Sequence, residues 1–128
     1  MQTCYTTRLS PTAAAIADLV RPGELTPNWT ITRINVPQAF RGQGYASALL
    51  REILNDADNG HETLQLEVFP SGGLNYEQLE AWYKRYGFKE ASTGYMVRKP
   101  QQPKRSSREI LHDFGYTDDQ INWMLLGR

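Results

Sequence analysis

The chain has 128 residues, the size of one ordinary domain. Hydrophobic residues make up 40% and charged residues 22%, and both fractions are typical of a globular protein. Its 14 Lys and Arg residues balance 14 Asp and Glu residues, so the net charge is zero and we do not expect a general electrostatic nucleic-acid binder.

The sequence also argues against a membrane, secreted or metal-bound protein. No run approaches the roughly 18 apolar residues of a membrane-spanning helix. Residues 13–20 are the best candidate for a signal peptide, but the stretch is short and Asp18 interrupts it. The single cysteine, Cys4, cannot form an internal disulfide, and no zinc-type spacing of ligands is present. We therefore expect a cytoplasmic protein with no membrane partner and no metal.

The N-terminal segment is weakly patterned. Residues 4–8 are compatible with a short strand. Ser10 followed by Pro11 resembles an N-cap with proline at the first helical position, which predicts a helix over Ala13–Val20. Pro22 ends that element.

The central segment predicts a strand, a glycine-rich loop and a helix. Residues 30–36 are β-branched and alternate, with Ile34 and Val36 on one face. A loop over residues 38–44 precedes a helix that ends near Gly60. The helix has an apolar stripe made of Ala46, Leu49, Leu50, Ile53 and Leu54.

Three further elements follow. Residues 62–69 predict a strand with Leu64, Leu66 and Val68 on one face. An aromatic stripe then predicts a helix that Gly87 terminates. The stripe consists of Tyr76, Leu79, Trp82, Tyr83 and Tyr86. Residues 88–99 predict a strand or a hairpin. The order strand, helix, strand, helix, strand indicates an α/β or α+β domain with a central sheet flanked by helices.

The C-terminal segment predicts a linker and two short helices. Residues 98–108 contain two prolines and no acidic residue. Ser106 with Glu109, and Thr117 with Gln120, fit capping boxes. The two helices would pack through Ile110, Leu111 and Phe114 against Ile121, Met124 and Leu125. We expect a domain over residues 1–99, a linker over 100–105 and a helical extension over 106–128.

The loop from Arg41 to Ala46 (RGQGYA) is the first sign of function. It lies where a strand leads into a helix N-terminus, whose free N–H groups and dipole favour an anion. Glycines allow close approach of a phosphate, so a phosphate-bearing ligand is one interpretation. A turn that merely joins two elements explains these residues equally well. A Walker ending is absent, and the match to a Rossmann turn is partial.

Three motifs together resemble the GNAT family of acetyl-CoA-dependent N-acetyltransferases. Arg41-x-x-Gly44-x-Ala46 is similar to the family's pyrophosphate loop, and it follows a strand end, residues 35–37, that resembles the family's splayed central strand. Leu66-Glu67-Val68 is similar to its next strand, and residues 81–88 to its helix ending in Tyr-x-x-x-Gly-Phe. The resemblance covers residues 30–97. It implies a single GNAT-like domain, here with a shortened N-terminal part.

The resemblance implies how acetyl-CoA, as co-substrate, would be held. Backbone groups of Ile34, Asn35 and Val36 would face the pantetheine arm and the thioester. Arg41 would fix the loop or contact phosphate, although a solvated loop arginine is the plainer interpretation. The pyrophosphate would lie on backbone amides of the loop and first helical turn, namely Gly42, Gln43, Gly44, Tyr45, Ala46 and Ser47.

The resemblance also implies catalytic residues. Tyr83 matches the tyrosine that protonates the leaving thiolate, although it also fits a core aromatic stripe. Glu67 matches the strand glutamate that serves some members as general base; it lies opposite the main apolar face and would point to a groove or to solvent. Asn75 matches a cofactor-binding asparagine, but it lies eight residues before Tyr83 rather than the family's seven.

We therefore expect transfer of an acetyl group to a primary amine of a small molecule or protein, by direct attack in a ternary complex. Only 29 residues precede the strand at Thr30, where the family usually has more elements that form the acceptor wall. The acceptor site would be open to a macromolecule, or completed by the C-terminal helices or by a second subunit in a homodimer. The alternative is an inactive GNAT scaffold that acts as a protein-interaction module.

Nucleic-acid contact is a third hypothesis. The basic residues around the linker are Arg98, Lys99, Lys104, Arg105 and Arg108. A solvated linker explains them better.

Overall fold

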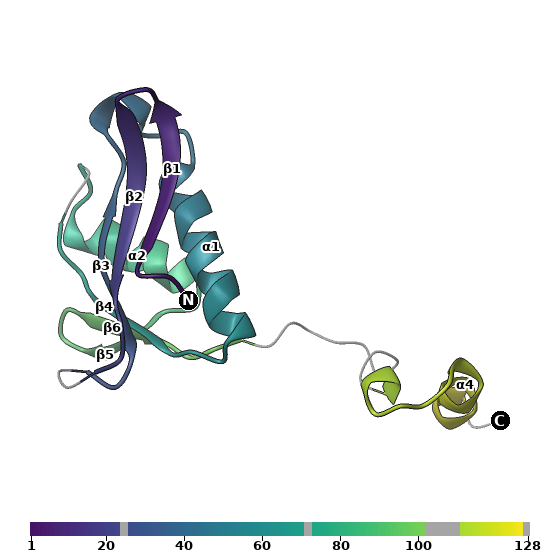
Figure 1. The fold of residues 1–128 in the computed structure, drawn as a ribbon. Coiled ribbons are helices and arrows are strands. Elements are labelled where there is room, and N and C mark those ends of the chain that lie inside the picture. The colour runs from purple at the N-terminus through teal and green to yellow at the C-terminus, as the bar shows by residue number, and fades with distance from the viewer. Residues whose placement is uncertain (24–25, 71–72, 102–110, 127–128) are drawn as a thin grey trace.

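The computed structural model describes residues 1–23, 26–70, 73–101 and 111–126, and within these ranges six strands form one mixed sheet (Figure 1). The strand order is β1-β2-β3-β4-β6-β5. The strands are β1 (Cys4–Ser10), β2 (Ala13–Val20), β3 (Trp29–Asn35), β4 (Leu64–Glu67), β5 (Lys89–Ser92) and β6 (Tyr95–Arg98). The helices are the 3-10 turn η1 (Gln38–Phe40), α1 (Tyr45–Asn59), α2 (Tyr76–Arg85) and α4 (Asp118–Leu126). The expected single α/β domain with a mixed sheet flanked by helices is confirmed.

The helix predicted over Ala13–Val20 is wrong, because this segment is strand β2. It pairs antiparallel with β1 on one side and with β3 on the other. Ser10 and Pro11 begin the tight turn of the β1–β2 hairpin instead of a helix, and the Ser10 hydroxyl accepts the N–H of Thr12. Serine at the first position and proline at the second suit a type I turn as well as a helix N-terminus, so the local signal is ambiguous.

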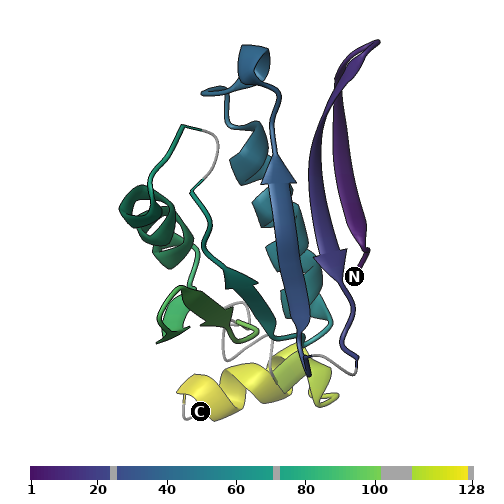
Figure 2. The same ribbon diagram turned by 90° about the vertical axis from the view of Figure 1, so that its left-hand side faces the viewer.

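Two irregularities in β3 shape the centre of the sheet. Asp18 pairs with Arg33 whereas Leu19 pairs with Ile31, so Thr32 is an extra residue in a β-bulge. The bulge reverses the alternation: Ile31 faces the core before it, and Val36 after it. The parallel pairing of β3 with β4 also stops at Ile31, so the two strands separate toward their C-terminal ends (Figure 2). The splayed strand end that the resemblance implied is therefore present.

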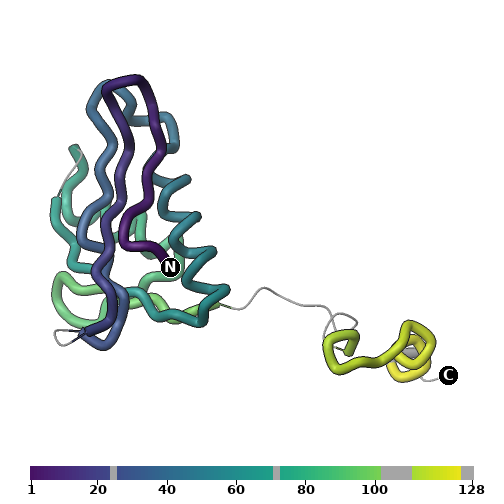
Figure 3. Tube along the Cα trace, in the orientation of Figure 1, coloured from purple at the N-terminus to yellow at the C-terminus, as the bar shows by residue number. Residues whose placement is uncertain are grey.

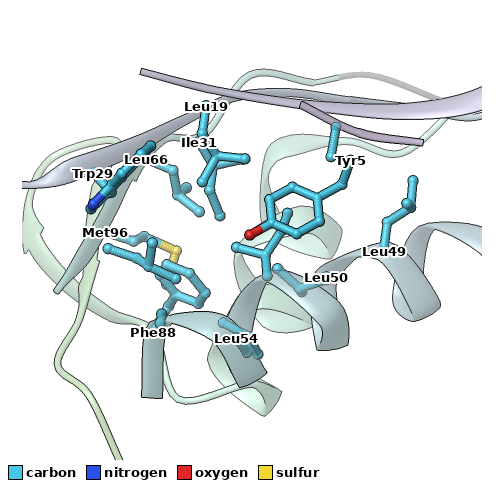
Figure 4. Packing of buried hydrophobic residues seen from close by; sticks show 14 of the residues in the cluster. Tyr5, Leu19, Trp29, Ile31, Leu49, Leu50, Leu54, Leu66, Phe88 and Met96 are labelled. Atoms are coloured by element: carbon cyan, nitrogen blue, oxygen red, sulfur yellow. The ribbon is translucent and has the colours of Figure 1, made fainter. Parts of the chain in front are cut away.

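Helix α1 links these two parallel strands and covers one face of the sheet, as the chain trace in Figure 3 shows. Its buried residues are Leu49, Leu50, Ile53, Leu54 and Ala57, in agreement with the predicted stripe. They meet Tyr5, Leu19, Ile31 and Leu66 from the sheet in one apolar core (Figure 4). Ala15 and Ala17 are fully buried in β2, which α1 contacts. Small residues there allow the helix to approach the sheet.

The opposite face of the sheet carries solvent-exposed or half-buried side chains. They include Thr6, Asp18, Arg33, Glu67 and Tyr95. In Figure 2 the strands β3 and β4 lie in front of α1, and none of the described helices crosses this face. An antiparallel or mixed sheet tolerates one solvated face. None of the described helices therefore lies over β3 and β4 on the side away from α1 (Figure 2).

A buried arginine ties the C-terminal strands to the helices. Residues 88–99, for which a strand or a hairpin was expected, form the hairpin β5–β6, in which β6 lies between β4 and β5. Arg98 is 4% exposed and holds Asp58 of α1 through two hydrogen bonds, of 2.7 and 3.1 Å. Its Nε donates to the carbonyl oxygen of Tyr86 at 2.8 Å. One side chain thus joins β6 to the C-terminal ends of α1 and α2, and it acts as structure rather than as a nucleic-acid contact.

The C-terminal part is described for residues 111–126. The predicted capping box of Thr117 with Gln120 is confirmed by reciprocal bonds of 2.9 and 3.3 Å, and Ile121 is fully buried. The expected box of Ser106 with Glu109, most of the expected linker, Ile110 and the Leu125 side chain lie outside what is described. Among the described residues no helix is long and apolar enough to span a membrane.

Candidate active site

The loop between β3 and α1 is anchored to the strand that it follows. Pro37 starts the short turn η1, which returns the chain toward α1. The Nε of Arg41 donates to the carbonyl oxygen of Val36 at 2.9 Å. Arg41 is otherwise exposed, and its terminal amino groups make no bond with the described residues. Arg41 therefore fixes the loop through its Nε, while the two terminal amino groups of its guanidinium remain available to bind an anion.

Two glycines place the N-terminus of α1 open to the solvent. Gly42 and Gly44 have φ angles of +79° and +85°, and nothing lies within 4 Å of where their Cβ atoms would be. Gly44 is the N-cap of α1 and has no side chain to accept a helix N–H. The first intrahelical bond runs from Ala48 N–H to Gly44 O at 3.0 Å. The amides of the preceding turn are thus without a capping acceptor, in the region where the helix dipole attracts negative charge.

These elements surround a pocket of about 380 Å³. A volume of this order is typical of sites for small molecules and cofactors. Three segments line it: the splayed end of β3 with the loop after it, the first turn of α1, and one face of α2 together with Leu74 just before that helix. The lining residues are Ile34, Asn35, Val36, Phe40, Arg41, Gly42, Gly44, Tyr45, Ala46, Ser47, Leu74, Leu79, Trp82 and Tyr83.

Helix α2 has well-defined ends, which fix the position of Tyr83. Asn75 caps its start: the side chain accepts the N–H of Gln78 at 2.9 Å, and the Gln78 side chain accepts the N–H of Asn75 in return. At the other end Gly87 adopts a φ of +94°. The Phe88 N–H donates to Tyr83 O and the Gly87 N–H to Lys84 O, which together make a Schellman motif.

Tyr83 is the lining residue whose acidity is most perturbed. Burial raises the pKa of its hydroxyl to about 12. Its ring contacts Trp82 and Phe88 at centroid distances of 4.9 and 5.5 Å. The hydroxyl makes no hydrogen bond with the described residues, and since no buried side-chain oxygen among them lacks a partner, it is accessible from the pocket. A phenol in this state stays protonated at neutral pH and is free to donate its proton to a bound group.

Most of the residues that sequence analysis singled out meet in this pocket, but three do not line it. Gln43 is an exposed loop residue. The Asn75 side chain is committed to capping α2. Glu67 is exposed at the end of β4, on the solvated face of the sheet.

Four lining residues were not predicted as part of the site: Phe40, Leu74, Leu79 and Trp82. They are apolar and come from two separate segments, so only the tertiary arrangement identifies them. No group of three or more metal-ligating side chains occurs among the described residues.

A splayed parallel strand pair, an uncapped helix N-terminus and a half-buried tyrosine surround one pocket. A family model for the acetyltransferase (GNAT) domain matches residues 11–90. The chain therefore belongs to the GNAT acetyltransferase family. No curated protein sequence matches it significantly.

Solved structures show the same fold at low sequence identity. The ribosomal-protein-S18-alanine N-acetyltransferase from Escherichia coli aligns with a TM-score of 0.58 and 21% identity, over 83% of this chain and 75% of that one. The anti-CRISPR protein AcrVA5 aligns with a TM-score of 0.53 and 16% identity, over 75% and 98%. Ard1 from Thermoplasma volcanium aligns with a TM-score of 0.50 and 19% identity, over 69% and 64%.

Proposed function

We propose that the protein is an acetyl-CoA-dependent N-acetyltransferase that acts on a primary amine. The observation that carries this proposal is that the uncapped start of α1 and the half-buried side chain of Tyr83 line the same pocket. One end of that pocket suits an anion and the other suits proton donation. Membership of the GNAT family supports this use of the two groups.

The residues present fit acetyl-CoA. Its pyrophosphate would lie on the free amides of Tyr45, Ala46 and Ser47, where glycines leave room for close approach. The terminal amino groups of Arg41 would add charge-assisted bonds. On its β4 side, β3 has no partner strand beyond Ile31, so the backbone groups on that side are available to the amide-containing pantetheine arm. When bound, acetyl-CoA supplies an activated acetyl thioester.

Tyr83 would hold the proton that a departing thiolate requires. A proton transfer from an acid of pKa about 12 to a thiolate of ordinary pKa, about 8.5, is uphill by roughly 5 kcal/mol. The same burial that raises the pKa of Tyr83 would also raise that of a sulfur in this pocket, which narrows the difference. Desolvation therefore brings the pKa values of the Tyr83 hydroxyl and of the leaving thiol closer together, so the raised pKa of Tyr83 does not prevent proton donation.

The acceptor we propose is an amine on a protein, entering through the solvated face of the sheet. No described helix covers that face near the gap between β3 and β4 (Figure 2). A small-molecule acceptor has to be enclosed by the enzyme to be bound, whereas a protein acceptor can bind to an open face through its own large surface. Glu67 lies on this face, and we propose that its carboxylate receives the proton of the attacking amine.

Calorimetric titration with acetyl-CoA tests the cofactor site. Ser47 is half-buried in the first turn of α1. Ser47→Asp should stabilise the helix, since an acidic residue there favours the dipole, yet weaken acetyl-CoA binding by at least roughly tenfold through repulsion of the pyrophosphate. Ser47→Asn is the uncharged control of similar size and should bind nearly as the wild type does. A folded wild type that binds no acetyl-CoA would overturn the proposed function.

A further inference from the structure

The described C-terminal residues form a small helical unit with a tightly held turn. Residues 111–113 are helical, and Gly115 follows with a φ of +91°. The N–H of Tyr116 donates to Leu111 O at 3.2 Å, and that of Gly115 donates to His112 O at 2.9 Å. The capping box of Thr117 then starts α4 at once. Hydrogen bonds on both sides therefore fix the backbone of Tyr116 between the end of one helix and the start of the next.

Helix α4 exposes an aromatic and apolar face. Ile121 is fully buried, whereas Trp123 is 65% exposed, Tyr116 42% and Met124 40%. Large aromatic residues gathered on an exposed surface mark interaction sites, and tryptophan and tyrosine dominate the energy of many interfaces. The packing within this helical unit thus leaves several large apolar side chains exposed to solvent.

These side chains border a groove of about 430 Å³, which is lined by Tyr116, Asp119, Gln120, Trp123 and Met124. Asp119, Gln120, Trp123 and Met124 are three and four residues apart along one side of α4, and Tyr116 lies just before the helix. Asp119 is the charged group in the groove, and it makes no bond with the described residues. Its neighbour Asp118 is engaged by His112 at 2.8 Å. The groove therefore combines two aromatic rings with one unpaired carboxylate.

The formal charges within residues 111–126 are acidic, whereas Arg108 and Arg128, which flank this segment in the sequence, are basic. Residues 111–126 contain Asp113, Asp118 and Asp119, and they contain no Lys or Arg. We propose that this groove binds a Lys or Arg side chain of a basic segment in a partner protein. The cation would lie over the faces of Trp123 and Tyr116 with Asp119 as its counter-charge, and its aliphatic stem would pack on Met124. This site is independent of acetyl transfer.

The test is binding of blocked peptides to the full chain at low ionic strength, measured by calorimetry. In three peptides, serine alternates with arginine, with glutamine or with glutamate. The arginine peptide should bind and the other two should not. Trp123→Ala should weaken binding by about fivefold, the size of a cation–π contact at an exposed site. Asp119→Asn should weaken it by about threefold, within the range of an exposed ion pair.

Phe114→Ala is the matched control, since Phe114 is 76% exposed in the same unit but does not line the groove. It should bind like the wild type, and circular dichroism should show all variants folded. Equal binding of the glutamine peptide would overturn the proposal in favour of apolar docking. Self-association that Trp123→Ala abolishes, without binding of the arginine peptide, would overturn it in favour of a second copy of this chain.

Discussion

The carbonyl oxygen of Tyr83 accepts the N–H of Phe88 at 3.3 Å, and the two rings meet nearly edge to face with centroids 5.5 Å apart. This pair is the backbone bond and the hydrophobic contact of a Schellman motif whose left-handed residue is Gly87. The Tyr-x-x-x-Gly-Phe spacing therefore has a structural reason. Phe88, which closes the C-terminal turn of the helix with its N–H, also packs its ring against the phenol ring of Tyr83.

Replacing Tyr83 by phenylalanine removes the hydroxyl and keeps the ring contact. If Tyr83 is the acid, Tyr83→Phe should lower kcat by about 10²-fold or more, with little change in acetyl-CoA affinity. Because burial raises the pKa of Tyr83 to about 12, the wild-type rate should show no loss from this group below about pH 10. Tyr86→Phe is the control on the same helix, because Tyr86 does not line the pocket. Equal rates for the two variants would assign Tyr83 to packing alone.

The left-handed turn after α2 should be sensitive to any side chain. A Cβ on Gly87 would meet the side chain of Gln101 and lie 3.3 Å from Nε of Arg98. Gly87→Ala should destabilise the protein by more than the roughly 1–2 kcal/mol that left-handed backbone alone imposes. Gly94→Ala isolates that backbone term, since Gly94 has a φ of +81° and open space around it. Chemical denaturation of both variants measures the difference, and equal losses would contradict a steric contribution at Gly87.

The pairing of Asp58 with buried Arg98 should contribute stability that depends on pH. Burial by itself raises the pKa of Asp58, but bonds from Arg98 and from the Gln101 N–H outweigh it, and the net pKa is lowered. A depressed carboxyl pKa contributes stability that is present above the unfolded value, near pH 3.9, and is lost as pH falls through the folded value. Asp58→Asn should therefore destabilise the protein by about 3 kcal/mol at pH 7.

Asp18→Asn provides the matched control for that measurement. Asp18 pairs with Arg33 at the same distance of 2.7 Å, but Arg33 is 58% exposed whereas Arg98 is 4% exposed. Its loss should cost less than about 1 kcal/mol. The advantage of the wild type over Asp58→Asn should shrink as pH falls below the unfolded pKa and through the lowered folded pKa, and an advantage that does not shrink in acid would contradict the ionic origin of the effect.

The crossover from β3 through α1 to β4 and the β5–β6 hairpin were predictable because their patterns are local. Residues 30–36 alternate, α1 carries a 3.6-residue stripe, and residues 92–94 contain turn residues. Ala13–Val20 was predicted as a helix because Ser10 and Pro11 resemble a helix N-terminus, whereas the state of this segment depends on pairing with both neighbouring strands. Long-range pairing of this kind has no signal within the segment itself.

The pocket shows a similar division. The glycine loop and Tyr83 were identified as candidate site residues because their motifs resemble those of the GNAT family, and both lie near a helix end with a left-handed glycine. Phe40 and Leu74 line the pocket only because the fold brings η1 beside the start of α2. For Asn75, the extra residue in the spacing to Tyr83 matters: the side chain lies at the N-cap of α2 and outside the pocket lining.

Glu67→Gln tests the acceptor side, and its effect should depend on the acceptor amine. At pH 7, deprotonating a lysine of pKa about 10.4 costs roughly 4.6 kcal/mol, whereas an α-amine of pKa about 8 costs roughly 1.4 kcal/mol. Loss of the base should therefore lower kcat/KM by about 10²-fold for a lysine acceptor and much less for an α-amine. The remaining rate should keep rising with pH, because hydroxide then replaces the carboxylate. Glu90→Gln changes an exposed glutamate of β5 and serves as the control. If both variants keep the wild-type pH profile, Glu67 is a solvated residue and the amine loses its proton to water.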